Sequence, residues 1–478
     1  MNSALDLQFV FPEVILLVCA LGSLMGGVMA PRKKLLGFLA LLGIVSAGLL
    51  LPLSSQAGSM FFSRMLVNDP FSVFFRQLLL IISGLVVLLS MGYEGLENED
   101  SGEYYFFLLL MTISMMLAVS STHLLLMYIA LETVSIISYL VAGYDKRDKY
   151  SSEAGIKYFI FGALSTGILL YGVTLIYGLF GTLDLTVIVQ HLPAAGTPQQ
   201  GAFFLALLLI FAGLGFKCSL VPFHMWTPDV YQGAPTPVAA FFSIGPKAMG
   251  FALLLRVFTQ HFSWGTFNGT TAALVIAALT MTVGNIMALT QTHIKRLLGY
   301  STIAQAGYIF AGAALGTAAG NQAVLIYLFI YTVMNVGAFG AVIALGNTQK
   351  SRYIEDYVGL YKRDPVTAVA LTVCLLSLAG IPPLAGFLAK FTILAAIVDA
   401  KHIPLAVVLV INSVVALYYY ARLIKNMFFE EPSSPSPLPS KPPALQVLLI
   451  LCVLANIFIG LWPQPLIDWL TCLFLPSN

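Results

Sequence analysis

"FKCSLVPFHMWTPDV", residues 216–230, places a lysine and a proline inside a long apolar part of the chain. Lys217 lies near the end of an apolar run that begins at Gly201, and Pro222 follows five residues later. A charged side chain at membrane depth is costly, and a proline removes a backbone donor and clashes with the preceding helical turn. We therefore expect a helix that breaks inside the membrane, next to a buried charge. Such a break is stable only within protein or beside a water-filled cavity.

The composition excludes a soluble protein. Of the 478 residues, 59% are hydrophobic and only 9% are charged, and the mean hydropathy is +0.91. A soluble domain usually has about 25% charged residues, and no soluble fold of this length could bury so much apolar surface. We predict an all-α polytopic protein of the lipid bilayer. The lysines and arginines are sparse and form no basic stripe, so we expect no nucleic-acid partner.

The sequence contains no pattern typical of a metal, cluster or nucleotide site. No CxxC or HExxH occurs, and the glycines of "AGLGFKCS", residues 212–219, fit neither a phosphate loop nor a dinucleotide fingerprint. We expect all five cysteines to be buried small hydrophobes and the chain to bind no cofactor of its own. The first basic residue, Arg32, follows the first apolar run, so we predict no cleavable signal peptide.

Apolar runs of roughly 20 residues, the length of a membrane-spanning helix, recur along the chain. We predict fourteen of them, at residues 9–30, 33–53, 70–92, 104–120, 123–143, 154–180, 201–222, 236–259, 270–290, 296–316, 321–346, 366–399, 403–425 and 443–463.

The basic residues predict an orientation for these helices. With the N-terminus outside, the four residues on the outer side are Arg64, Arg76, Arg256 and Lys401. Fifteen fall on the inner side: Arg32, Lys33, Lys34, Lys146, Arg147, Lys149, Lys295, Arg296, Lys350, Arg352, Lys362, Arg363, Arg422, Lys425 and Lys441. Cytoplasmic loops are enriched in lysine and arginine, so we expect both termini on the outer side.

Four charged residues are expected deep in the membrane: Glu132, Lys217, Lys247 and Lys390. Charges kept there at such cost are functional candidates, so we expect these four to transfer ions or protons. Glu132 shares one helical face with Tyr128, Ser135 and Tyr139, which predicts a polar stripe toward the bundle interior.

Three prolines and a histidine accompany the lysines. Pro246 directly precedes Lys247, where we expect a kink, and Pro382 and Pro383 precede Lys390 by eight and seven residues. His224 lies just past the predicted break at Pro222 and is a possible proton relay, because histidine titrates near neutral pH; a structural histidine is the alternative.

The seventh and twelfth predicted helices share one plan: an apolar run, a proline break, and a lysine within two turns of it. They lie five helices apart, which predicts two inverted five-helix repeats with broken helices 7 and 12. We predict five segments: three N-terminal helices in 1–103, a first repeat in 104–260, a second in 261–429, a proline-rich linker in 430–443, and a last helix with its tail in 444–478.

Three stretches carry a family resemblance: residues 216–257, "IKRLLGYSTIAQAGYI" at 294–309, and "SLAGIPPLAGFLAKF" at 377–391. They resemble the antiporter-like membrane subunits of respiratory complex I, most closely the subunit N branch. The likeness spans nearly the whole chain and includes the helix count. It implies that the key residues of the family correspond to Glu132, Lys217, Lys247 and Lys390. Gln305 stands where some relatives have histidine, which leaves open whether it relays protons.

The resemblance implies a subunit of a proton-translocating NADH:quinone oxidoreductase that has no redox site of its own. NADH or another donor, FMN, iron–sulfur clusters and quinone are then expected in partner subunits of the membrane and peripheral arms. The bacterial inner membrane is the expected location, with both termini on the periplasmic side. In this scheme Lys217 keeps its proton while Glu132 is near and passes it to Lys247 and Lys390 when they separate.

Three alternatives remain open from the sequence. The chain could serve a multisubunit Na⁺(K⁺)/H⁺ antiporter, or a hydrogenase- or ferredoxin-linked relative of complex I. It could also be a structural subunit whose charges only pair helices. Three lysines against one glutamate argue against the last alternative, because buried structural charges should come in pairs.

Overall fold

The computed structural model describes residues 3–29, 34–52, 60–96, 101–192, 197–267, 269–349, 352–431 and 441–474. Eleven described helices are long and apolar enough to cross a membrane: α1 (Ser3–Met29), α3 (Pro70–Met91), α4 (Ser101–Ser120), α5 (Leu124–Ala142), α6 (Lys149–Phe180), α8 (Pro198–Cys218), α10 (Thr236–Leu255), α11 (Thr270–Leu289), α13 (Ala318–Gln349), α17 (Ile403–Phe429) and α18 (Pro443–Leu461).

Three further crossings complete the fourteen predicted ones. α2 (Lys34–Leu50) is apolar but shorter, and the twelfth crossing is divided into α15 (Pro365–Ala379) and α16 (Ala385–Asp399). α12 (Ile294–Ala314) has the necessary length, but polar residues lower its hydropathy. The remaining elements are short: β1 (Met60–Phe61), β2 (Leu66–Val67), η1 (Glu94–Leu96), α7 (Leu185–Gln190), α9 (Trp226–Gly233), η2 (Arg256–His261), η3 (Trp264–Phe267), η4 (Ile354–Tyr357), α14 (Leu360–Arg363) and α19 (Gln464–Phe474).

The seventh crossing is broken, but earlier than predicted. α8 ends at Cys218, Ser219 adopts a left-handed conformation with φ of 60°, and the helix resumes as α9. The predicted helix end at residue 222 was therefore wrong. A proline ring clashes with the carbonyl four residues before it, and Cys218 stands four residues before Pro222. The helix ends at the last residue that this clash allows.

The twelfth crossing breaks for the same reason. α15 ends at Ala379, four residues before Pro383, and Gly380 caps it with φ of 88°. The predicted single span at 366–399 is thus two helices separated by residues 380–384.

Other boundaries differ from the predictions by about a turn. α6 starts at Lys149 rather than at residue 154, and α17 runs to Phe429 rather than to residue 425. α10 continues without interruption across Pro246. The predicted apolar tail forms the amphipathic helix α19. The proline-rich linker lies largely outside the described residues.

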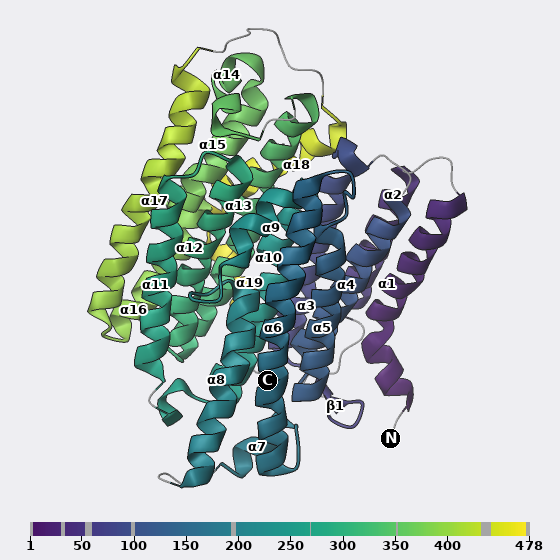
Figure 1. Cartoon of the computed structure of the whole chain (residues 1–478), viewed down its shortest axis with the longest axis vertical. Coiled ribbons are helices and arrows are strands. Elements are labelled where there is room, and N and C mark those ends of the chain that lie inside the picture. The colour runs from purple at the N-terminus through teal and green to yellow at the C-terminus, as the bar shows by residue number, and fades with distance from the viewer. Residues whose placement is uncertain are drawn as a thin grey trace.

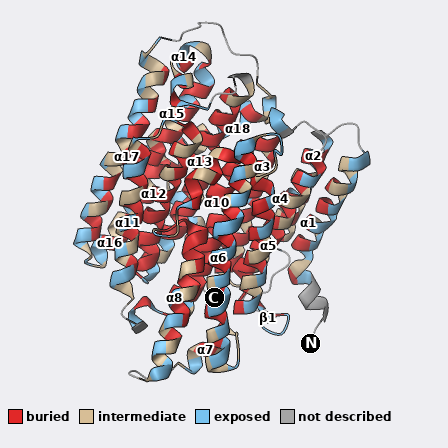
Figure 2. Cartoon of the chain, viewed as in Figure 1, coloured by how far each residue is buried: buried red, intermediate tan, exposed pale blue. Residues whose placement is uncertain are grey.

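The helices are arranged around a central pair. α1 and α2 lie at one side of the bundle and α17 at the other, with α10 and α13 between them (Figure 1). Every residue of α10 is buried, and Figure 2 shows that buried residues concentrate in this middle region. Peripheral helices expose large apolar side chains such as Val18 and Val414. That pattern is expected of helices that face lipid.

Candidate functional site

Lys217 occupies the last turn of α8, directly before the break, and is only 2% exposed. Its Nζ donates a hydrogen bond of 3.1 Å to Ser135 Oγ on α5. The Ser135 hydroxyl donates in turn to the carbonyl of Leu131 at 2.8 Å, which leaves its lone pairs free to accept from the lysine. A hydroxyl of the predicted polar stripe is therefore the hydrogen-bond partner of the buried ammonium.

Glu132 lies on the same helix as Ser135, three residues earlier, and is partly buried. Thr166 of α6 lies beside its carboxyl group. Glu132 Oε2 is buried without a protein hydrogen-bond partner. No ion pair within 4.0 Å joins Glu132 to Lys217 in the described part of the chain, and the lysine donates to Ser135 instead.

Close packing of α10 against α8 brings Lys247 to the same region. A Cβ atom added to Gly250 would lie 2.9 Å from Cys218 Sγ and 3.4 Å from Lys217 Cβ, so only glycine permits this approach. Lys247 is 2% exposed, and its Nζ lies 3.5 Å from the Thr302 carbonyl of α12. The second lysine thus faces a backbone oxygen of α12.

Lys390 lies on α16 and reaches back to the end of α15. Its Nζ donates a 2.9 Å hydrogen bond to the carbonyl of Ala379, the last residue of that helix. The final carbonyls of a helix have no partner within it and carry partial negative charge. The break at Gly380 therefore creates an acceptor for a buried ammonium, and no carboxylate pairs with Lys390 among the described residues.

Gln305 connects α12 to the same helix end. Its Nε2 donates a 3.1 Å hydrogen bond to the carbonyl of Leu378, and its Oε1 accepts one from the hydroxyl of Tyr327. Gln305 stands one turn beyond Thr302 on α12. This helix therefore provides contacts both to Lys247 and to the carbonyls that hold Lys390.

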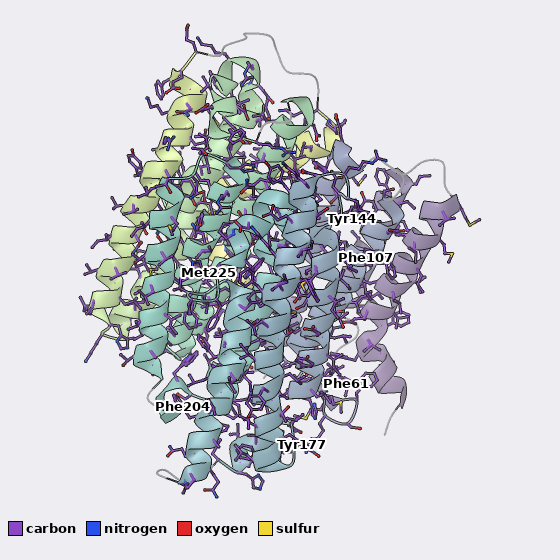
Figure 3. All side chains as sticks on the ribbon, viewed as in Figure 1. Phe61, Phe107, Tyr144, Tyr177, Phe204 and Met225 are labelled. Carbon is purple, nitrogen blue, oxygen red and sulfur yellow. The ribbon has the colours of Figure 1, made fainter. Side chains whose placement is uncertain are left out.

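His224 lies in the break between α8 and α9 and is partly buried. Its Nδ1 has no protein partner, and no described hydrogen bond joins it to a lysine. The neighbouring Met225 is 66% exposed, and Figure 3 shows it between the levels of Tyr144 and Tyr177, nearer to that of Tyr144. Met225 lines a shallow apolar pocket of about 150 Å³ together with Phe161 and Trp226. The relay role of His224 therefore stays a prediction, because no hydrogen bond in the described chain connects this histidine to Lys217, Lys247 or Lys390.

Two buried arginines were missed by the sequence analysis, which assigned Arg76 and Arg256 to the outer side of the membrane. Both are at most 2% exposed and lie in helical segments, Arg76 in α3 and Arg256 in η2. Arg76 pairs with Glu13 of α1 at 2.8 Å, and Arg256 pairs with Asp69, the N-cap of α3, at 2.5 Å. The signals that could have revealed them were Glu13 inside the first apolar run and the Asp69–Pro70 helix start.

A buried amide and tyrosine cluster also escaped notice. Asn285 of α11 donates to the Tyr308 hydroxyl at 3.0 Å and to Asn412 of α17 at 3.1 Å. It accepts from Tyr419 at 3.1 Å. The sequence signal that could have revealed this cluster is the presence of Asn285 and Asn412 within apolar runs. The cluster joins three helices next to Lys390, whose Nζ lies 4.5 Å from the centre of the Tyr308 ring.

The charge pattern separates two kinds of buried cation. Arg76 and Arg256 each face a carboxylate, as expected for charges that hold helices together. The three lysines face a hydroxyl or backbone carbonyls instead. A hydroxyl or carbonyl oxygen accepts a hydrogen bond from the ammonium but has no full negative charge that would keep the lysine protonated. Such partners suit a lysine that exchanges protons.

The described residues contain no cluster of three metal-ligating side chains. Cys19, Cys218, Cys374 and Cys452 are free and buried, and the side chain of Cys472 lies outside the described set.

The chain was compared with known proteins. The family model for the NADH:quinone oxidoreductase/Mrp antiporter transmembrane region matches residues 121–416, which include both broken helices. The chain is 42% identical to NADH-quinone oxidoreductase subunit N of Trichlorobacter lovleyi over 429 residues, or 89% of this chain and 88% of the relative. It is 41% identical to NAD(P)H-quinone oxidoreductase subunit 2 of Gloeobacter violaceus, over 90% of this chain and 84% of the relative.

Solved structures give the same result. A chain of respiratory complex I from Thermus thermophilus is 34% identical, with a TM-score of 0.80 over 96% of this chain and 98% of its own length. A chain of the Mrp complex from Dietzia has a TM-score of 0.81, covering 99% of this chain and 97% of its own length. At 23% identity, this second likeness shows the fold alone.

Proposed function

This chain belongs to the NADH:quinone oxidoreductase/Mrp antiporter transmembrane family, and we propose that it is a proton-translocating membrane-arm subunit of a complex I-type quinone oxidoreductase. The observation that carries the proposal is the set of three buried lysines, each without a carboxylate partner within ion-pair distance in the described chain. The relatives named above belong to NADH- and NAD(P)H-quinone oxidoreductases.

We assign proton transfer to Lys217, Lys247 and Lys390 in that order. When Glu132 approaches Lys217, the carboxylate keeps the proton on the lysine. When the two are apart and Lys217 donates to Ser135, Lys217 passes its proton to the neutral amine of Lys247. Lys247 then passes a proton on to Lys390, from which it leaves to the outer side. Water at the two breaks would bridge gaps too long for direct transfer, and His224 is a further candidate relay near the first break.

The energy for this movement comes from outside the chain in our proposal. Partner subunits would hold the FMN, the iron–sulfur clusters and the quinone site, and would accept electrons from NADH or another donor. Quinone reduction there would change the distance between Glu132 and Lys217 through contacts with neighbouring membrane-arm subunits. Such coupling needs a part of the fold that has two conformations, and both the quinone site and the Glu132–Lys217 pair must shift the balance between them. The break between α8 and α9 is our candidate for this part.

We also propose a location and an internal symmetry. An even number of crossings places both termini on one side, and the excess of lysine and arginine between crossings favours the opposite side as the cytoplasm. This gives a bacterial inner membrane protein with periplasmic termini. The breaks at 219–225 and 380–384 support two inverted repeats covering 104–260 and 261–429.

A cation/proton antiporter subunit is the second candidate, because the fold is shared with the Mrp complex. It would move Na⁺ or K⁺ against protons without quinone chemistry. A hydrogenase- or ferredoxin-linked complex would use the same membrane chemistry with a different donor, and only the peripheral partners would distinguish it.

Purification of the tagged chain in mild detergent, followed by mass spectrometry of its partners, tests these candidates. We expect co-purifying subunits with iron–sulfur clusters and a quinone site. In reconstituted vesicles, quinone reduction should acidify the lumen independently of Na⁺. Small membrane partners alone, with Na⁺-dependent proton movement, would instead identify an antiporter.

A further inference from the structure

Each of the three buried lysines lies over the ring of a buried tyrosine. Lys217 Nζ is 5.9 Å from the centroid of the Tyr158 ring, and Lys247 Nζ is 5.9 Å from that of Tyr231. Lys390 Nζ lies closer, at 4.5 Å from the Tyr308 centroid. The three tyrosines are fully buried.

The tyrosines come from different helices of the two repeats. Tyr158 belongs to α6, Tyr231 to α9 and Tyr308 to α12. The pairing therefore does not follow from one repeated helix contact. A cation within about 6 Å of an aromatic centroid is attracted by the negative face of the ring, most strongly where water is excluded.

Neighbouring groups fix two of these rings, those of Tyr158 and Tyr308. Tyr158 stacks on Trp226 with centroids 4.3 Å apart and an angle of 8° between the ring planes. The hydroxyl of Tyr308 accepts a 3.0 Å hydrogen bond from Asn285, which is itself held by Asn412 and Tyr419. A ring held in place can attract a cation without reorganising each time the lysine gains or loses a proton.

The buried arginines provide the contrast. Arg76 lies over Phe9 and Arg256 over Phe71, but each of them also has a carboxylate partner. The lysines have the ring without the carboxylate. A buried carboxylate left behind by a departing proton would be an uncompensated charge, whereas an aromatic ring stays neutral in both states of the lysine.

We infer that Tyr158, Tyr231 and Tyr308 are positioning residues that stabilise the protonated lysines through their ring faces, so that each lysine can release its proton without leaving a buried anion. The inference rests on the proton-transfer role proposed above. Tyr308 has the largest effect, because its ring is nearest to a lysine.

The test uses the assembled complex in sealed vesicles and measures protons pumped per quinone reduced. Tyr308→Phe keeps the ring and stays within about twofold of the wild type. Tyr308→Leu lowers pumping by about tenfold, the change expected for losing a desolvated cation–π contact. Tyr158→Leu and Tyr231→Leu should lower pumping by about twofold to threefold, because these rings lie farther from their lysines than the Tyr308 ring does.

A series of fluorinated phenylalanines at position 308 separates charge attraction from shape. Fluorine withdraws electron density from the ring face with little change in size, so pumping should fall stepwise with one, two and three fluorines. Phe310→Leu is the matched control. Phe310 is buried on the same helix and contacts Phe211 and Trp264, with no lysine over its ring in the described chain.

Two outcomes have different meanings. If Lys390→Ala abolishes pumping while the fluorine series is flat and Tyr308→Leu equals Tyr308→Phe, the ring has no electrostatic role and the inference fails alone. If Lys390→Ala pumps normally, the proton-transfer role of this lysine fails, and the inference fails with it.

Discussion

At the residue scale, the partner of each buried cation indicates its role. Lys217, Lys247 and Lys390 donate to oxygens that carry no full charge. Arg76 and Arg256 face Glu13 and Asp69. A guanidinium stays protonated in proteins, whereas a buried ammonium can lose its proton. The choice of lysine over arginine is therefore part of the chemistry at the three sites.

Substitution of Lys217 tests this distinction. Lys217→Ala should lower proton pumping on the order of a hundredfold, the usual contribution of a positioned proton-transfer group, while the complex still assembles. Lys217→Arg should not restore pumping, because arginine does not deprotonate. Pumping is measured in inverted vesicles during quinone reduction. Lys425→Ala is the control, since that lysine is exposed; wild-type pumping by Lys217→Ala would contradict the proposal.

Glu132 and Ser135 should differ in severity. Glu132→Gln removes the charge that holds the proton on Lys217, and we expect a loss nearly as large as that of Lys217→Ala. Ser135→Ala removes one hydrogen bond to the ammonium and should cost only several-fold. The comparison uses the same pumping assay at equal amounts of assembled complex. Equal effects of the two substitutions would show that Ser135 does more than accept a hydrogen bond.

At the element scale, the two helix breaks create the sites. α8 ends in Lys217 and Cys218, and the carbonyl of Phe216 accepts a hydrogen bond from the Trp226 indole across the break. α15 ends in carbonyls that accept hydrogen bonds from Lys390 and Gln305. Both breaks occur where a proline prevents the helix from continuing. A continuous helix would satisfy these carbonyls internally and offer nothing to a side chain.

Gly380 is the position where the second break is most sensitive. Its φ of +88° favours glycine, and a Cβ atom there would lie 2.8 Å from Lys390 Cδ. Gly380→Ala should cost about 1–2 kcal/mol in backbone strain and displace Lys390. We expect pumping to fall several-fold, measured together with the melting temperature of the purified complex.

Gly167→Ala is the matched control for this change. Gly167 lies within α6 with no atom within 4 Å of an added Cβ, so the substitution should leave both pumping and melting temperature unchanged. Normal pumping by Gly380→Ala would show that Lys390 does not depend on the break geometry.

At the scale of the whole molecule, buried ion pairs connect the N-terminal helices to the bundle. The Arg76–Glu13 pair joins α3 to α1, and Arg256 joins η2 to the start of α3 and to the Val119 carbonyl of α4. In the described chain, no hydrogen bond or ion pair joins these groups to Lys217, Lys247 or Lys390. They hold the helices together and do not take part in the proposed transfer.

Arg76→Leu should therefore destabilise the protein without changing its chemistry. Removing one member of a buried pair leaves an uncompensated charge, at a cost of about 3–5 kcal/mol. We expect a lower yield of assembled complex and a lower melting temperature, but normal pumping per assembled complex. The double variant with Glu13→Gln and Arg76→Met should recover most of the stability. A loss of pumping at full assembly would place this pair in the transfer path.

Local sequence patterns are sufficient to predict the membrane class, the fourteen crossings, the two broken helices and the four deep charges. Each of these follows from local chemistry: long apolar runs need lipid, proline ends a helix, and a charge in an apolar run is costly wherever it lies. Glu132, Lys217, Lys247 and Lys390 could be selected without any contact map for this reason.

Which side chains meet depends instead on how the helices pack in three dimensions. The hydrogen bond from Lys217 to Ser135, the tyrosine rings near the lysines, and the carbonyl of α15 that accepts from Lys390 all join residues distant in the chain. The buried state of Arg76 and Arg256 has the same origin, because each carboxylate partner lies more than 60 residues away. Hydropathy describes a residue and its neighbours in sequence, whereas charge compensation depends on which helices pack together.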